Sequence, residues 1–243
     1  MKKVAIITGG SRGIGAATTK ELAKAGYAVC INYHSAKDKA ELLASNINKN
    51  GGRAIAVKAD VAKEKDILAL FETVDHELGP ITALVNNAGI NGGISTVENI
   101  TSECLQSVFA TNVFGTFLCC REAIRRMKQA GYGSIVNVTS EAARFGGNQL
   151  SHYAASKAAI NTFTVGFARE VAPFNIRVNT VSPGVIDTEI HQASPPDRLK
   201  NLIASLPTGR MGAPEEVAQA IVWLLSDQAS YLSGTIVPIT GAR

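Results

Sequence analysis

The sequence predicts an α/β fold: one domain, residues 1–243, built on a doubly wound parallel sheet of about seven strands with helices on both faces. Three observations lead to this prediction. Short runs rich in Val and Ile alternate with amphipathic helical patterns along the whole chain. Most of these runs are continuously apolar, as in strands that are covered on both faces. No repeat, low-complexity stretch or linker divides the 243 residues, a length that one hydrophobic core supports.

Seven apolar runs are the expected strands: residues 4–8, 28–33, 54–59, 83–86, 135–140, 177–182 and 235–239. The helical patterns between them cover residues 14–25, 37–50, 63–78, 102–127, 151–172 and 214–226. Because a parallel neighbour is reached only through a crossover, this alternation predicts right-handed strand–helix–strand units. Residues 186–210 break the rhythm with three prolines. A long insertion near the carboxyl edge of such a sheet favours a flexible substrate lid.

Composition argues against several classes of function. The formal net charge is only +4, and the densest basic cluster, Arg125, Arg126 and Lys128, ends a helical pattern, where cations favour the helix dipole. We therefore expect no nucleic-acid partner. No apolar run approaches the ~18–20 residues of a membrane span, and the first one is too short for a secretion signal.

The cysteines are also informative. Cys30, Cys104, Cys119 and Cys120 form no CxxC pair and have no His at metal-ligand spacing. We expect no metal site, buried thiols at Cys119 and Cys120, and a cytoplasmic protein that does not bind membranes.

A glycine-rich turn, TGGSRGIG, occupies residues 8–15 between the first strand and the first helix. Glycines allow the backbone to approach a pyrophosphate closely, and the helix N-terminus offers free N–H groups and partial positive charge. The GxxxGxG spacing differs from the commoner GxGxxG. The alternative is a simple tight turn, but its position favours dinucleotide binding in a Rossmann-type fold.

The end of the second strand indicates which dinucleotide is preferred. Proteins specific for NAD usually place Asp or Glu there to hold the ribose 2′-hydroxyl. Here the residues are Asn32, Tyr33, His34 and Ser35, with no carboxylate. The guanidinium of Arg12, in the glycine turn, suits a 2′-phosphate, unless Arg12 is only an exposed loop cation. We expect NADP(H) to be preferred, with NAD(H) possible.

A proton-transfer group is predicted around Tyr153 and Lys157, which are four residues apart and so share one helical face. A phenol titrates near pH ~10, and a nearby ammonium is expected to lower its pKa. Ser140 closes the preceding strand, where its hydroxyl can hold a substrate oxygen, although a turn or capping role is the alternative. His152 is expected to be structural because neighbouring helical residues point in different directions. His191, in the expected lid, is a further candidate for substrate contact.

Taken together, these motifs resemble the short-chain dehydrogenase/reductase family over essentially the whole chain. The glycine turn matches the family's cofactor loop, and Asp60 with Val61 matches the pair that holds the adenine. Residues 86–89, Asn-Asn-Ala-Gly, match the family's NNAG motif. Pro183 and Gly184, followed by Thr188, match the turn that holds the nicotinamide.

The resemblance implies a set of site residues and their roles. The catalytic tetrad would be Asn112, Ser140, Tyr153 and Lys157. The cofactor-binding residues would be Gly9, Ser11, Arg12, Gly13, Ile14, Gly15, Asn32, Tyr33, His34, Ser35, Asp60, Val61, Asn87, Ala88, Gly89, Tyr153, Lys157, Pro183, Gly184, Ile186 and Thr188. Tyr153 would exchange a proton with the substrate oxygen, and Lys157 would lower its pKa and bind the nicotinamide ribose. Ser140 would position the substrate oxygen, and Asn112 would hold a water that relays protons.

Three function classes remain open: an oxidoreductase for small carbonyl or alcohol substrates, a dinucleotide-sensing regulator, and a scaffold. The intact tetrad favours the enzyme. Within it, the alternatives are a 3-oxoacyl-acyl-carrier-protein reductase and a glucose-type sugar 1-dehydrogenase. Such reductases tend to carry an arginine before the fifth strand and another after the active-site helix, whereas residues 129–133 and 172–175 hold no basic residue here. The helices expected over residues 102–127 and 151–172 carry apolar residues on more than one face, which together with the resemblance implies a homotetramer.

Overall fold

The structure is a computed structural model that describes residues 3–189 and 196–242. His191 and part of the expected lid at residues 186–210 lie outside the described residues, so the lid assignment stays a prediction. All seven expected strands are present, within two residues of the expected bounds. They are β1 (Val4–Ile7), β2 (Ala28–Tyr33), β3 (Arg53–Lys58), β4 (Ala83–Asn86), β5 (Gly133–Val138), β6 (Ile176–Pro183) and β7 (Ile236–Ile239).

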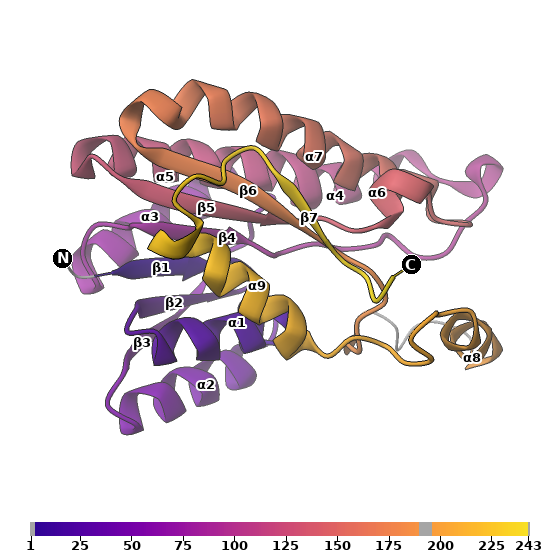
Figure 1. Ribbon diagram of the computed structural model, residues 1–243, viewed down its shortest axis with the longest axis horizontal. Coiled ribbons are helices and arrows are strands. Elements are labelled where there is room, and N and C mark those ends of the chain that lie inside the picture. The colour runs from indigo at the N-terminus through magenta and orange to yellow at the C-terminus, as the bar shows by residue number, and fades with distance from the viewer. Residues whose placement is uncertain (1–2, 190–195, 243) are drawn as a thin grey trace.

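The strands form one parallel sheet in the order β3-β2-β1-β4-β5-β6-β7 (Figure 1). In the centre of the sheet, Ile6 of β1 pairs in register with Cys30 of β2 on one side and Leu84 of β4 on the other. All three side chains are fully buried, as the continuously apolar strand sequences predict. The doubly wound parallel sheet is therefore confirmed.

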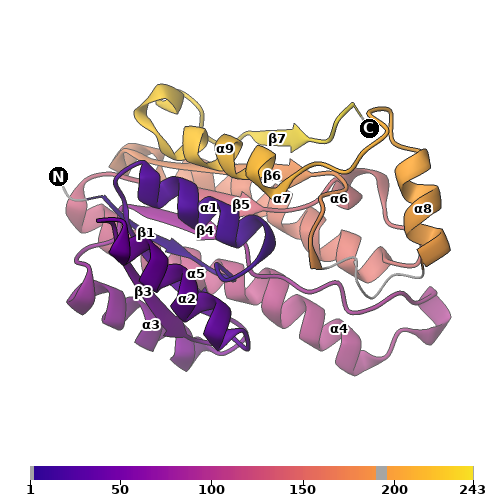
Figure 2. The same cartoon turned by 90° about the horizontal axis from the view of Figure 1, so that it is seen from below.

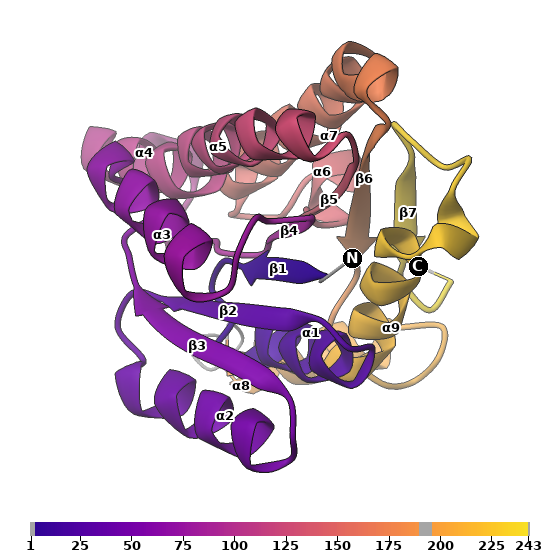
Figure 3. The same ribbon diagram turned by 90° about the vertical axis from the view of Figure 1, so that its left-hand side faces the viewer.

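Helices cover both faces of this sheet, and each face has its own core. Apolar residues of α3, α5 and α7 pack on one face, and those of α1, α2 and α9 pack on the other (Figure 3). These helices are α1 (Gly13–Lys24), α2 (Lys37–Lys49), α3 (Glu64–Glu77), α5 (Gly115–Ala130), α7 (Ser151–Val171) and α9 (Pro214–Leu225). Cys119 and Cys120 are buried in the first core, as predicted, and burial raises the pKa of the Cys119 thiol to about 12.

The structure differs from the sequence-based expectation in three places. The single helix expected over residues 102–127 is divided into α4 (Ser102–Phe109), a π-helical turn (Ala110–Phe114) and α5. Two further helices were not predicted, α6 (Ala142–Phe145) and α8 (Pro196–Ala204). A four-residue helix is too short to show a helical period, and the prolines of the second segment favour an irregular loop.

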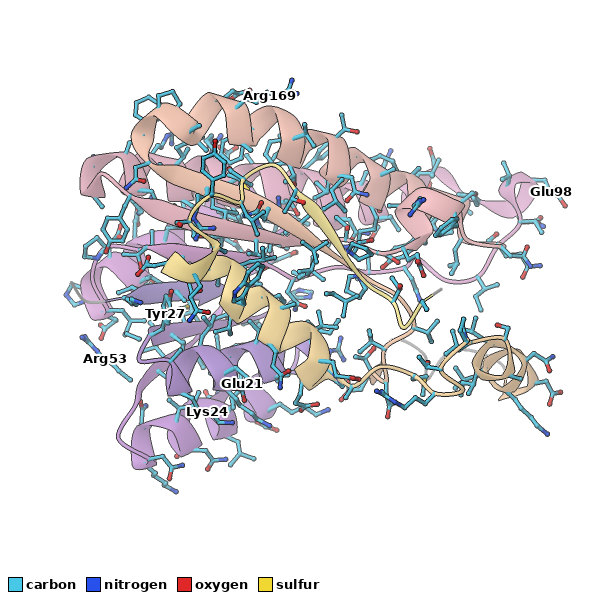
Figure 4. All side chains as sticks on the ribbon, in the orientation of Figure 1. Glu21, Lys24, Tyr27, Arg53, Glu98 and Arg169 are labelled. Atoms are coloured by element: carbon cyan, nitrogen blue, oxygen red, sulfur yellow. The ribbon has the colours of Figure 1, made fainter. Side chains whose placement is uncertain are left out.

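The carboxyl ends of all strands meet at one edge of the sheet, where α6 and α8 also lie (Figures 1 and 2). Tyr27 and Arg53, just before or at the start of β2 and β3, lie at the opposite edge, far from Glu98 on the loop after β4 (Figure 4). Because β1 has β2 on one side and β4 on the other, the strand order reverses at β1, and in doubly wound sheets this is the point where the ligand crevice lies, outside the carboxyl ends of the strands.

Two negative findings concern the described residues. None of their helices has the length and apolarity needed to cross a membrane. Nor do they contain a group of three or more His, Cys, Asp or Glu side chains that could hold a metal ion.

Candidate active site

The glycine loop connects β1 to α1 and depends on residues without side chains. Gly9 has φ +60°, and a Cβ there would lie 3.0 Å from the Ala88 Cα on the neighbouring loop. A Cβ on Gly15 would lie 2.3 Å from the Gly9 carbonyl oxygen, which is closer than atoms can approach. Glycine at these two positions therefore allows the helix to start directly against the loop.

Hydrogen bonds hold this loop to the loop after β4. The Asn87 Nδ2 donates to the carbonyl oxygens of Thr8 and Gly9, both at 3.0 Å. In return, the Thr8 hydroxyl accepts from the backbone N–H groups of Asn87 and Ala88, both at 3.0 Å. The glycine loop and the loop after β4 are thus joined by four hydrogen bonds, in which Asn87 takes part through its side chain as well as its backbone.

The N-terminus of α1 suits an anionic group. Within the described part of the chain, no side chain caps this helix and no acidic residue lies in its first turn. Its first N–H groups and partial positive charge are therefore available to a phosphate. Thr188, from the segment after β6, lies against the same turn, because a Cβ on Gly13 would be 3.1 Å from its Cγ2. These residues fit a dinucleotide pyrophosphate.

Asn32 lies beneath the glycine loop rather than facing the solvent. Its side chain is only 2% exposed; its Oδ1 accepts from the Gly9 N–H at 3.2 Å, and its Nδ2 donates to the Ala59 carbonyl at 3.0 Å. Asn32 therefore supports the loop, and the exposed residues at this strand end are His34 and Ser35. His34 Nε2 approaches Asp60 Oδ2 at 3.9 Å, which brings together the predicted ribose and adenine residues.

Tyr153, Lys157 and Ser140 converge at the carboxyl edge beside this loop. Tyr153 and Lys157 share one face of α7, with the Lys157 Nζ 5.8 Å from the centroid of the tyrosine ring. Lys157 is 5% exposed, and its Nζ donates to the Val138 carbonyl at 2.9 Å. The hydroxyl of Ser140, just after β5, lies near enough to the Tyr153 phenol to act on its pKa. Three predicted catalytic residues thus meet.

The proton affinities of this group follow from burial. Burial raises the pKa of Tyr153, and the nearby Ser140 hydroxyl offsets part of the rise. This is opposite to the direction predicted from the Tyr–Lys spacing, because loss of hydration outweighs any effect of the ammonium. Burial also lowers the pKa of Lys157 from its ordinary 10.5 to about 8. At neutral pH both groups hold their protons, which suits proton donation to a carbonyl oxygen.

Asn112 is placed by the π-helical turn, which interrupts the regular period of the helix. Its Oδ1 accepts from the Ile90 N–H and its Nδ2 donates to the Ile90 carbonyl, both at 2.9 Å. The Nδ2 also donates to Ser156 Oγ at 3.0 Å. A Cβ on Gly89 would lie 3.2 Å from both the Asn112 Oδ1 and the Lys157 Nζ, so glycine there lets the loop pack between them. Sequence reasoning missed Ser156, which no spacing rule marks.

The remaining predicted residues lie around the same edge. Pro183 ends β6, and Ile186, 5% exposed, pairs with Gly212 in a short β-bridge. Ser11 and Val61 are also buried, at the ends of β1 and β3. His152 is 3% exposed with its Nε2 2.8 Å from the Asn91 carbonyl oxygen, so it holds the loop after β4, in agreement with a structural role.

Comparisons with known proteins give the family. The family model described as short chain dehydrogenase matches residues 3–199. The chain is 47% identical to an uncharacterized oxidoreductase, YgfF, of Escherichia coli K12, over 99% of each chain. It is 36% identical to glucose 1-dehydrogenase 2 of Bacillus subtilis 168, over 98% of this chain and 93% of that protein.

A third relative is a 3-oxoacyl-[acyl-carrier-protein] reductase, FabG, of Staphylococcus epidermidis RP62A, which is 33% identical over 99% of this chain and 98% of that protein. These matches cover the glycine loop, the Asn-Asn-Ala-Gly segment and the Tyr153–Lys157 pair together. By the family match and by these relatives, the chain belongs to the short-chain dehydrogenase/reductase family and is an oxidoreductase of the kind that uses a nicotinamide nucleotide.

Proposed function

We propose that the protein interconverts small carbonyl compounds and alcohols, with NADP(H) preferred over NAD(H). The observation that carries this proposal is the meeting of Ser140, Tyr153 and Lys157 beside the glycine loop. A dinucleotide-sensing regulator or a scaffold needs the loop but has no use for a half-buried phenol beside a serine hydroxyl and a buried lysine.

The bound cofactor would supply or accept the hydride, and the side chains do the rest. Glycine-loop N–H groups and the α1 N-terminus would bind the pyrophosphate. The Ser140 hydroxyl would hold the substrate oxygen beside the phenol, and Tyr153 would donate its proton to that oxygen during reduction. Lys157 would bind the nicotinamide ribose and stabilise the phenolate that remains. In the oxidation direction the deprotonated form of Tyr153 would accept the proton of the alcohol.

The relatives named as a carrier-protein reductase and a glucose dehydrogenase define the substrate alternatives. An acidic carrier protein requires a basic docking surface. Of the three cations near the two stretches that lack arginine, Arg126 pairs with Asp75 at 2.6 Å and Arg125 pairs with Glu122 at 2.8 Å. The third, Lys128, lies over the Phe174 ring, 3.8 Å from its centroid. This pairing favours small free substrates over carrier-bound thioesters.

We expect kcat/KM for small free carbonyls or sugars to exceed that for a β-ketoacyl thioester on acyl carrier protein. A panel of both substrate types, followed by cofactor absorbance with NADPH and with NADH, tests the proposal. NADPH is expected to be preferred by at least about tenfold, which is the effect of one charge-assisted hydrogen bond. A hundredfold advantage for the carrier-bound thioester would make the carrier-protein reductase the better assignment. No turnover with any substrate would favour a regulator.

We also propose that the chain forms a homotetramer. Phe114 and Phe117, around the start of α5, are 60% and 43% exposed, and Leu105 of α4 is 41% exposed. On a different part of the chain, Trp223 of α9 and Tyr231 are 43% and 102% exposed. Two separate apolar surfaces suit two kinds of symmetric contact.

The mass in solution is therefore expected to be about four times 25.5 kDa. Light scattering at micromolar concentration measures it. A Phe117→Asp variant should reduce the assembly to smaller species, because a carboxylate is costly to bury in an apolar contact. A parent chain that runs as a monomer would contradict the proposal.

A further inference from the structure

The carboxylate of Glu189 bridges two cations at the mouth of the cofactor crevice. Its Oε2 accepts from the Arg12 Nη1 at 3.0 Å, and its Oε1 accepts from the Lys39 Nζ. The three residues come from three different parts of the chain: the glycine loop, the first turn of α2, and the segment after β6. Sequence reasoning identified Arg12 but neither Lys39 nor Glu189.

The position of this cluster connects it to the cofactor. Arg12 immediately precedes α1, whose N-terminus is open to a pyrophosphate, and Lys39 follows the strand end that carries His34 and Ser35. The two cations therefore flank the place where the adenosine ribose of a bound dinucleotide would lie. Each gives a hydrogen bond to a different oxygen of one anion, which is the way in which a phosphate is bound.

The ion pairs that Glu189 forms with Arg12 and Lys39 are weak enough for another anion to replace the carboxylate. The side chains of Arg12 and Lys39 are 56% and 57% exposed, and that of Glu189 is 32% exposed. Ion pairs with this exposure contribute only about 0–1 kcal/mol each. A phosphate carries more charge than a carboxylate and has three acceptor oxygens, so it can replace Glu189 on the same two cations.

We propose that Lys39 is, with Arg12, a ligand of the cofactor 2′-phosphate, and that Glu189 occupies the phosphate's place in the cofactor-free chain. This inference rests on the proposed preference for NADP(H). The consequence differs between the two cofactors. A cofactor with a 2′-phosphate must displace the Glu189 carboxylate and then forms ion pairs with both Arg12 and Lys39. NAD(H) neither displaces the carboxylate nor forms these ion pairs. Lys39 therefore raises the preference for NADP(H), and Glu189 lowers it.

Binding of NADPH, NADH, 2′-AMP and 5′-AMP to the full-length chain, measured by calorimetry, tests this proposal without turnover. Glu189→Gln is expected to tighten NADPH and 2′-AMP binding about fivefold, and Lys39→Met to weaken both about fivefold or more. NADH and 5′-AMP should bind each variant as they bind the parent chain. The Glu189→Gln gain should shrink in the double variant, because one of the released cations is then missing.

The neighbouring pair on α2, Lys37 with Glu41 at 3.7 Å, provides matched controls. Lys37→Met repeats the Lys39→Met change on the same helix, and Glu41→Gln repeats the loss of a paired carboxylate. Both should leave the ratio of NADPH to NADH affinity unchanged. The proposal is overturned if Glu189→Gln alters NADPH and NADH binding alike or alters neither, or if the control variants have the same effect. A parent chain that binds both cofactors equally would contradict the proposed preference; selective tightening by Glu189→Gln would still support the bridge.

Discussion

A Tyr153→Phe variant is expected to lose turnover by a factor of about 10²–10⁴ while binding cofactor nearly as tightly as the parent chain. The substitution keeps the ring and removes only the hydroxyl, which lies near Ser140. Without that hydroxyl, the substrate oxygen loses the acid that is proposed to protonate it. Steady-state rates, together with NADPH titration, separate the loss of chemistry from any loss of binding.

Tyr132→Phe is the matched control, because Tyr132 directly precedes β5, at the edge of the sheet opposite the site. It should leave turnover unchanged. Thermal unfolding of both variants should show that neither substitution disturbs the fold. A loss of turnover smaller than tenfold in Tyr153→Phe would contradict the role of Tyr153 as the acid and base.

Much of this site could be predicted because its residues lie where strands end. The glycine turn follows β1, Asp60 follows β3, Asn87 follows β4 and Ser140 follows β5. A parallel sheet places all carboxyl strand ends at one edge, so the strand prediction alone assembles these residues. The helical period alone predicts that Tyr153 and Lys157 lie on the same face of their helix.

Other parts of the site depend on contacts that no local pattern contains. The π-helical turn that carries Asn112 lies within a pattern that predicts one regular helix, and the Ile90 backbone that binds Asn112 is 22 residues away. The bridge from Glu189 to Lys39 joins residues 150 positions apart. The proton affinity of Tyr153 was predicted in the wrong direction, because spacing shows the nearby lysine but not the degree of burial.

The buried lysine gives a second large expected effect, on stability. A Lys157→Met variant is expected to be inactive yet more stable than the parent chain at pH 7. Burial lowers the pKa of Lys157 from 10.5 to about 8, and each pKa unit corresponds to about 1.4 kcal/mol. The charged form therefore costs the folded chain about 3 kcal/mol. The variant also loses the hydrogen bond to the Val138 carbonyl, which reduces its gain in stability by about 1 kcal/mol. Methionine is unbranched and of similar length, so it can fill the same space.

The pH dependence distinguishes this origin from a general packing effect. Below pH 8 the lysine is protonated in both the folded and the unfolded chain, so the full cost is present. Between pH 8 and 10.5 the unfolded chain binds more protons than the folded chain, so the parent gains stability as the pH rises. The advantage of Lys157→Met should therefore be about 2 kcal/mol at pH 7 and shrink through this window. Chemical denaturation at several pH values measures it, with Lys24→Met, whose side chain is 72% exposed, as the control that should change little. If Lys157→Met were less stable than the parent chain across the whole range, packing around the lysine would outweigh its desolvation. A stabilised, inactive variant would instead show that the fold retains a costly buried charge because the reaction requires it.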